Sequence, residues 1–291
     1  MLLELTDVII SGLTNGSVYA LMAVGLTLVY GVTKAFNFAY GSLYSLGGYV
    51  AWVILRGMGL PGGYAAVFLV TLPVLMAVGY GVERAVVAPL RRRSDWEVKA
   101  MMITLGLALF LDNSYQVIFG PRMKALPAIL EGGMTVGPVV FSYQDIAIFV
   151  LALVAMGCFG WVLTYTRIGM AVRAVAQNPA GAQIVGIPKN AVFASTFAIS
   201  TAMVGVGGIL LSQKYFVSPN GGWDILVKSW VITAFGGMGS VAGSLYAAFI
   251  LGMLEAFVGW LFGMNWVLFA LFAVLLGILT VRPQGLLGKW G

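Results

Sequence analysis

The chain has 291 residues, of which 60% are hydrophobic and 9% are charged, and its formal net charge is +6. Soluble domains carry about 25% charged residues, so this composition excludes a soluble globular protein and requires most side chains to face lipid or other apolar helices. The sequence has no histidine, which excludes imidazole metal sites and histidine acid–base catalysis. Its single cysteine, Cys158, has no partner for an internal disulfide.

The first half of the chain predicts five membrane-spanning helices, because apolar runs of about 20 residues follow one another there. We expect them over residues 8–32, 38–55, 63–87, 98–119 and 143–165. The first two runs also carry polar and small residues, which either permit close helix packing or line a path through the bundle. The loop at 120–142 is rich in proline and glycine, and we expect it to contain a short hairpin or to lie on the membrane surface.

The second half predicts three further spans, over residues 191–211, 241–261 and 266–281. Between them, the apolar segment at 225–238 is broken by the glycine-rich run Gly236–Ser240. A span needs about 17 to 25 residues, so this segment is either a short, tilted helix that crosses or a re-entrant half-helix. The sequence therefore predicts an all-α, polytopic transmembrane helical bundle with about eight or nine spans, which forms one transmembrane domain over residues 1–291.

The positions of the basic residues orient this bundle. With the N-terminus outside and the segment at 225–238 crossing, the basic residues divide eleven to five in favour of the inner side. The inner side then holds Lys34, Arg84, Arg91, Arg92, Arg93, Lys99, Arg167, Arg173, Lys189, Arg282 and Lys289, and the outer side holds Arg56, Arg122, Lys124, Lys214 and Lys228. The excess of positive charge inside predicts a periplasmic N-terminus. Because the basic residues lie at the ends of apolar runs, they favour a topological role over nucleic-acid binding.

The largest polar interruption of the second half is residues 166–190, which the orientation above places in the cytoplasm. Its alanine- and glycine-rich, arginine-bearing sequence predicts a short helix–turn–helix. Asn178–Pro179 supplies an N-cap followed by proline in the first turn of the second helix. By itself, the segment could be an ordinary basic loop placed by the positive-inside rule.

The sequence lacks the motifs of nucleotide binding and of nucleophilic catalysis. The sequence has no glycine-rich phosphate loop ending in Lys–Ser or Lys–Thr, and no nucleophile motif, so we expect no catalytic residues and no bound metal. Asp112 and Glu255 are the carboxylates placed deepest in the spans, and for both we favour a structural or helix-end position over ion coupling. These residues leave two functions open. One is an ion-coupled secondary transporter or channel for small polar solutes, which would use Asp112, Glu255 or Lys228. The other is a non-transporting membrane scaffold.

An ordered series of motifs, running nearly from end to end, resembles the permease subunits of branched-chain amino acid ABC importers. The series comprises residues 13–20, 25–31, 36–41, 104–106, 119–121, 166–169, 173–177, 186–187, 236–240 and 282–285. The sequence departs from that family at Tyr40, where the family's segment often carries a histidine, so a role for that histidine does not transfer.

The resemblance implies a subunit of an ATP-driven importer in a bacterial or archaeal cytoplasmic membrane. Two permease chains would form the path, the second being different but similar, and two ATPase subunits would bind ATP and magnesium while this chain binds no cofactor. An external solute-binding protein would deliver a branched-chain amino acid, with urea or another amino acid as further possibilities. Lipid surrounds the chain, and no nucleic-acid partner is expected.

The resemblance also implies roles for particular residues. The segment 166–190 would dock on the ATPase as the coupling region, through residues Arg167, Gly169, Arg173, Ala174, Gln177, Asn178, Ala182 and Gly186. This chain's share of the path would include Asn15, Tyr19, Asn37, Tyr44, Thr104, Gly237 and Gly239. Because strong charges would trap a zwitterion, we expect that path to be neutral and weakly polar.

Overall fold

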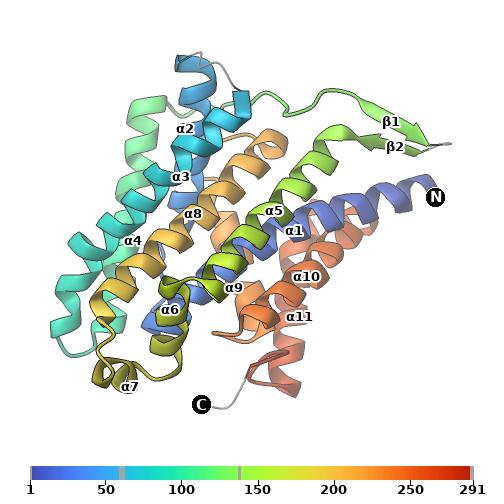
Figure 1. The fold of residues 1–291 in the computed structure, drawn as a ribbon. Coiled ribbons are helices and arrows are strands. Elements are labelled where there is room, and N and C mark those ends of the chain that lie inside the picture. The colour runs from blue at the N-terminus through green and yellow to red at the C-terminus, as the bar shows by residue number, and fades with distance from the viewer. Residues whose placement is uncertain (1, 59–62, 137–138, 289–291) are drawn as a thin grey trace.

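The computed structural model describes residues 2–58, 63–136 and 139–288, and it is a bundle of helices with one small antiparallel hairpin (Figure 1). The long helices are α1 (Leu2–Thr33), α3 (Gly63–Val82), α4 (Trp96–Phe119), α5 (Tyr143–Tyr165), α8 (Lys189–Tyr215) and α10 (Val241–Leu261). The shorter α-helices are α2 (Tyr40–Val53), α6 (Arg167–Gln177), α7 (Pro179–Ile184), α9 (Gly222–Gly236) and α11 (Val267–Val281). The all-α transmembrane bundle predicted from the sequence is confirmed.

Seven helices of the described residues are long and apolar enough to cross a membrane, and their burial separates them into two groups. The most apolar windows of α1 and α8 are each 94% buried, whereas that of Met264–Val281 is 11% buried. The outer helices instead expose large apolar side chains, such as Leu69 on α3 and Phe110 on α4. The bundle is therefore built around α1 and α8, and its outer helices offer their apolar side chains to lipid.

Glycines allow the central helices to approach closely. Gly252 of α10 lies against Gly16 of α1, and a Cβ at Gly252 would come within 2.6 Å of the Gly16 Cα. At the crossing of α2 and α8, a Cβ at Gly47 would overlap the Gly205 carbonyl. Small residues at helix contacts are how membrane bundles gain van der Waals packing, so these glycines fix which helices meet.

Among the shorter helices, α2 and α9 lie inside the bundle and are each shorter than a full span. α2 has 14 residues and continues as a π-helical turn, η1 (Ile54–Met58). α9 is one continuous helix of 15 residues, which rises about 22 Å, less than the ~30 Å thickness of a hydrocarbon core. It corresponds to the segment that the sequence analysis left as either crossing or re-entrant. Gly222, at its start, packs against Gly41 at the start of α2.

The segment after α3 and the polar loop before α5 contain the remaining elements. Helix α3 is followed by a π-helical turn, η2 (Glu83–Val87), and a 3-10 turn, η3 (Ala88–Arg92). The loop before α5 forms the hairpin of β1 (Gly133–Val136) and β2 (Val139–Ser142), in which Gly133 pairs with Ser142. Of the two alternatives given for this loop, the hairpin is therefore confirmed. A further 3-10 turn, η4 (Met264–Trp266), precedes α11.

Figure 1 places α6, α7 and the C-terminal segment at one end of the bundle, and the N-terminus and the hairpin at the other. Arg91 belongs to the first end, because its guanidinium lies 4.4 Å from the ring centroid of Phe193 near the start of α8. This agrees with the grouping of basic residues used to orient the chain, although Lys289 lies outside the described residues. The assignment of this end to the cytoplasm stays a prediction.

Candidate functional site

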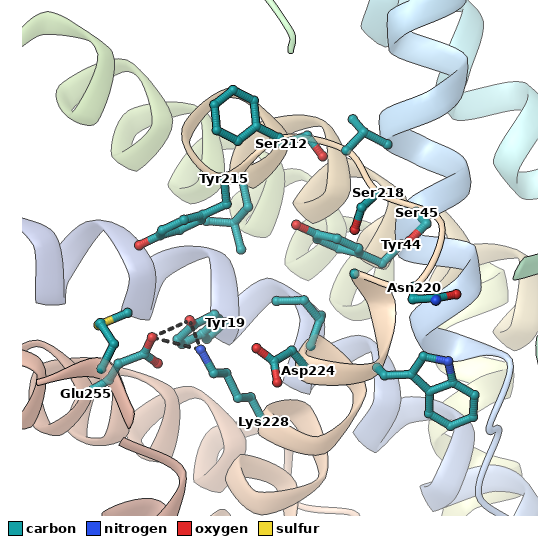
Figure 2. A pocket seen from close by; sticks show the side chains of 17 residues that line it. Tyr19, Tyr44, Ser45, Ser212, Tyr215, Ser218, Asn220, Asp224, Lys228 and Glu255 are labelled. Atoms are coloured by element: carbon teal, nitrogen blue, oxygen red, sulfur yellow. Dashed lines mark hydrogen bonds and ion pairs between the residues drawn. The ribbon is translucent and has the colours of Figure 1, made fainter. Parts of the chain in front are cut away.

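A cavity of about 450 Å³ lies between α1, α2, α8, α9 and α10 (Figure 2). Its volume lies within the range of small-molecule sites, about 300 to 1,000 Å³. The end of α8, the extended stretch 216–221 and the first turns of α9 form one side of it. Tyr19, Tyr44 and Glu255 close the other sides from α1, α2 and α10. We call it the central cavity.

One wall of the central cavity is a cluster of three polar side chains from three helices. The Lys228 ammonium donates to Glu255 Oε1 at 2.8 Å and to the Tyr19 hydroxyl at 3.1 Å. The Tyr19 hydroxyl in turn donates to the same Glu255 oxygen at 3.1 Å. The side chains of Lys228 and Glu255 are only 12% and 3% exposed. A buried charge is tolerated only when it is paired and hydrogen-bonded, and this cluster meets that condition for the ammonium and for one carboxylate oxygen.

The opposite wall carries aromatic rings and hydroxyl groups. Figure 2 shows Tyr44 and Tyr215 on the far side of the cavity from the Lys228 cluster, with Asp224 on the same side as that cluster. Apolar side chains from the same elements, among them Leu211 and Ile225, complete the lining. The cavity thus combines a few charged groups with apolar surface, the arrangement typical of a binding site for a small polar molecule.

A second cavity of about 350 Å³ adjoins the central one towards the N-terminus of α1 and shares Tyr215, Glu255 and Met264 with it. Its remaining lining includes Glu4, Asp7 and Asn15 of α1. The Asn15 amide donates to the Tyr215 hydroxyl at 3.1 Å. The Asn15–Tyr215 pair therefore lies where the two cavities meet.

The path residues predicted from the sequence separate into three groups. Tyr19 and Tyr44 line the central cavity, and Asn15 lines the second. Asn37 and Thr104 line neither of these cavities: the Asn37 side chain accepts from the Ala39 N–H at 3.0 Å, and Thr104 Oγ1 accepts from the Phe38 N–H at 3.1 Å. Those two side chains hold the non-helical linker between α1 and α2.

Gly237 and Gly239 lie at the other end of α9, away from the central cavity. Both have positive φ, of 104° and 88°, a conformation that favours glycine. The C-terminal segment folds beneath this turn, where the Leu286 N–H donates to the Phe235 carbonyl at 2.8 Å. Gly239 also lines a third cavity of about 320 Å³ together with Lys34.

The sequence analysis missed Asp224 and Lys228 as path residues and considered Glu255 only for ion coupling or helix-end solvation. The central cavity differs from the neutral, weakly polar lining expected of the path, since all three of these charged side chains line it; the course of the path itself stays a prediction. The available signal was the occurrence of charged residues within apolar runs. Nothing in the local sequence shows that Lys228 and Glu255 come from helices that meet.

Asp112 has a structural contact instead. It is 4% exposed, and its Oδ2 accepts from the Trp223 indole N–H at 2.8 Å. This bond ties α4 to the first turn of α9, so the structural interpretation of Asp112 agrees with its position. Within the described ranges, no group of three or more cysteine, aspartate or glutamate side chains is arranged to hold a metal ion.

A second candidate site is the segment 166–190, which forms the predicted helix–turn–helix as α6 and α7. Each of these helices begins at a side-chain N-cap. Thr166 Oγ1 accepts from the Gly169 N–H at 3.2 Å, and Asn178 Oδ1 accepts from the Gly181 N–H at 2.8 Å. The two helices are thus defined by their own sequence.

One face of α6 and α7 packs onto the bundle. Val172, Val175 and Ala182 are buried in a cluster with Val32 of α1 and Phe193 of α8. At Gly169, a Cβ would overlap the carbonyl oxygens of Val162 and Leu163 at the end of α5. The segment is therefore attached to the ends of three long helices.

The predicted coupling residues divide between the packed face and the exposed face of α6 and α7. Gly169 and Ala182 are buried and Ala174 is half-buried, while Arg167, Arg173, Gln177, Asn178 and Gly186 are exposed. The Arg173 guanidinium donates to the Thr164 carbonyl at 3.1 Å. The sequence analysis did not single out Ile184, the last residue of α7, and Val185, which follows it; they are 86% and 74% exposed. Exposed apolar side chains beside basic ones mark a surface suited to a protein partner.

Comparisons with known proteins extend over nearly the whole chain. The family model described as branched-chain amino acid transport system, permease component, matches residues 8–281. The high-affinity branched-chain amino acid transport system permease protein BraD of Pseudomonas aeruginosa is 33% identical, covering 97% of this chain and 95% of that protein. The corresponding protein LivH of Escherichia coli K12 is also 33% identical, covering 96% and 94%.

Among solved structures, PsaBC from Streptococcus pneumoniae in complex with Fab aligns with a TM-score of 0.49 and 14% identity, covering 97% of this chain and 92% of that one. A similarity of this size transfers no residue roles, so the sites rest on the contacts described above.

Proposed function

The chain belongs to the permease-component family of branched-chain amino acid transport systems, and on this basis we propose that it is one membrane-spanning subunit of an ATP-driven importer of branched-chain amino acids. The observation that carries this proposal is the match over residues 8–281, which includes the central cavity as well as the α6–α7 segment. The chain is a multi-pass membrane transport subunit and not an enzyme.

The importer would need further subunits. This sequence contains no phosphate loop, so ATP and magnesium would bind to two separate ATPase subunits. A second, similar permease chain would complete the path, and an external solute-binding protein would deliver the amino acid. Family membership and the absence of a phosphate loop from this sequence support the proposal of these partners.

We assign coupling to α6 and α7. Their buried face contacts α1, α5 and α8, so a displacement of this segment would be transmitted directly to the ends of three long helices. Their other face presents Arg167, Arg173, Ile184 and Val185. We propose that an ATPase groove accepts the two apolar side chains and that acidic groups at its rim pair with the arginines.

Reconstitution tests the function directly. The complete set of subunits in proteoliposomes should take up leucine only when ATP and the binding protein are both present. The permease chains alone should show no uptake with an imposed proton or sodium gradient. Uptake by the permease chains down such a gradient would contradict the proposal and support an ion-coupled transporter using the buried Lys228–Glu255 pair.

The coupling assignment has its own test. We expect Arg173→Glu to abolish ATP-dependent uptake while leaving membrane insertion intact, because the exposed guanidinium would be replaced by a charge that acidic groove residues repel. Arg122→Glu is the matched control, since Arg122 is exposed in the loop at the other end of the bundle. Normal uptake by Arg173→Glu would contradict the docking role of this arginine.

A further inference from the structure

The central cavity holds polar groups that the protein itself leaves unused. Glu255 Oε2 is buried and has no hydrogen-bond partner among the described residues. Asp224 lines the same cavity from the first turn of α9, and its carboxylate forms no hydrogen bond or ion pair within the described part of the chain. A buried acceptor without a partner is costly, so the Glu255 oxygen indicates that a donor is missing, and the Asp224 carboxylate, which is exposed, is open to a ligand in the cavity.

The charges of the lining show which kind of donor fits. Lys228 and Glu255 neutralise each other as an ion pair of 2.8 Å. Asp224 is the remaining charged side chain of the lining, so the cavity carries one uncompensated negative charge. An ammonium group beside Asp224 would balance that charge and supply hydrogen-bond donors.

Lys228 leaves one donor for an anionic group. A lysine ammonium has three N–H donors, and two of them are directed to Glu255 and Tyr19. The third is available to the cavity, which Lys228 lines. A ligand that brought only an ammonium would leave this donor unused, and a ligand that brought only a carboxylate would add to the negative charge of Asp224.

The remaining lining suits an aliphatic side chain. Leu211, Val217 and Ile225 contribute apolar surface, and the Tyr44 ring lies across the cavity from the Lys228 cluster. The cavity volume of about 450 Å³ is large enough for a small amino acid together with water.

We propose that the central cavity is a binding site for a free zwitterionic α-amino acid, with its ammonium group at Asp224 and its carboxylate at the third donor of Lys228. This inference rests on the proposed function, because it identifies a substrate site within the same permease. It adds that the permease itself binds the α-amino and α-carboxylate groups, so the solute-binding protein is not the sole subunit that recognises the substrate.

Equilibrium binding to the purified complex of permease and ATPase subunits, without the binding protein, tests the inference. Radiolabelled leucine is displaced by unlabelled leucine, by leucinamide, which lacks the carboxylate, and by 4-methylpentanoate, which lacks the ammonium group. The wild-type complex should prefer leucine over both analogues by about tenfold or more, as expected for the loss of one charge-assisted hydrogen bond.

Separate protein variants test the contact proposed for the ammonium group and the contact proposed for the carboxylate. Asp224→Asn should erase the preference for leucine over 4-methylpentanoate and retain the preference over leucinamide. The double variant Lys228→Gln with Glu255→Gln, which leaves no unpaired buried charge, should do the reverse. Asp95→Asn is the matched control, because Asp95 is an exposed residue before α4 at the other end of the bundle. Thermal unfolding of every variant shows whether it is folded, and Asp224→Ser provides a second replacement at that position.

The outcomes separate the inference from the function on which it rests. The wild-type complex could import leucine in proteoliposomes while both variants keep the ligand preferences of the wild type. That result would overturn the inference and leave the proposed function standing. Variants that weaken all three ligands equally would overturn it too, since a merely structural role predicts that pattern. A wild-type complex that neither binds nor imports leucine would overturn the proposed function itself.

Discussion

The central cavity and the α6–α7 segment are both polar parts of an apolar chain, but they satisfy their polar groups in opposite ways. In the cavity, Lys228, Glu255 and Tyr19 bind one another across three helices and are shielded from solvent. In α6–α7, the capping bonds are local, and the exposed residues include the basic Arg167 and Arg173 and the apolar Ile184 and Val185.

This difference separates a fixed site from a docking site. In a low-dielectric interior a charge must be paired, so the buried cluster of Lys228, Glu255 and Tyr19 is held by the protein's own contacts. At the bundle end, water solvates the arginines, and Ile184 and Val185 can stay exposed until a partner covers them. We therefore expect substitutions in the cavity to affect stability first, and substitutions on the exposed face of α6–α7 to affect transport first.

The largest effect on stability should follow from Glu255→Ala. This change leaves the Lys228 ammonium, which is 12% exposed, without its carboxylate, and breaking a buried pair costs about 3–5 kcal/mol. Chemical denaturation of the purified protein, followed by circular dichroism, measures the loss. The double variant Glu255→Ala with Lys228→Met should recover most of it, and a single variant as stable as the double one would contradict the pairing.

A smaller loss should follow from Gly169→Val on the packed face of α6. The new Cβ would overlap the Val162 and Leu163 carbonyl oxygens, and overpacking of this kind costs about 1–3 kcal/mol. Because α6 must move away from α5 to accommodate the side chain, ATP-dependent uptake should fall as well. Gly157→Val in α5 is the control, since a Cβ there meets nothing within 4 Å. Equal losses in both variants would contradict the tight contact.

Thr166→Ala should produce a local effect. It removes the hydroxyl that accepts from the Gly169 N–H at 3.2 Å, and the loss of such an N-cap costs about 1 kcal/mol. Amide hydrogen exchange should become faster in the first turn of α6 while α8 stays protected. Thr280→Ala, near the end of α11, removes a hydroxyl that caps no helix N-terminus and should leave α6 unchanged. Unaltered exchange in α6 of the Thr166 variant would argue against the cap.

The smallest effect on stability should come from Ile184→Asp. Ile184 is 86% exposed, so the free energy of unfolding should change by no more than about 0.5 kcal/mol. ATP-dependent uptake should nevertheless fall by about tenfold, because the proposed apolar contact with the ATPase would be lost. Leu130→Asp, in the loop at the other end, is the control. Unchanged uptake in the Ile184 variant would remove the distinction between the two regions.

Much of the fold could be predicted because hydropathy and helix breakers act locally. The expected spans 143–165 and 241–261 coincide with α5 and α10, and 98–119 lies within α4. The N-caps at Thr166 and Asn178 likewise depend on residues only three positions apart. Helix α8 extends beyond its predicted span at both ends, because Lys189 and Lys214 lie in its terminal turns, where a hydropathy criterion ends the segment too early.

The candidate site was less accessible to prediction. Tyr19 and Tyr44 were expected in the path and line the central cavity, whereas Asn37 and Thr104 hold a linker instead. Polar residues that line a cavity and polar residues that satisfy a backbone N–H look the same in an apolar run. Only the neighbouring helix decides between these two positions.

The sequence by itself determined that this protein is a helical membrane bundle of the permease family, because composition, apolar run length and ordered motifs are properties of the chain read in one dimension. The tertiary structure alone decided which charges meet. Lys228 and Tyr19 are separated by 209 positions, and they are brought together because glycines such as Gly16, Gly41 and Gly222 let α1, α2, α9 and α10 pack closely. In an interior that excludes water, that packing made a scattered lysine, glutamate and tyrosine into one buried cluster.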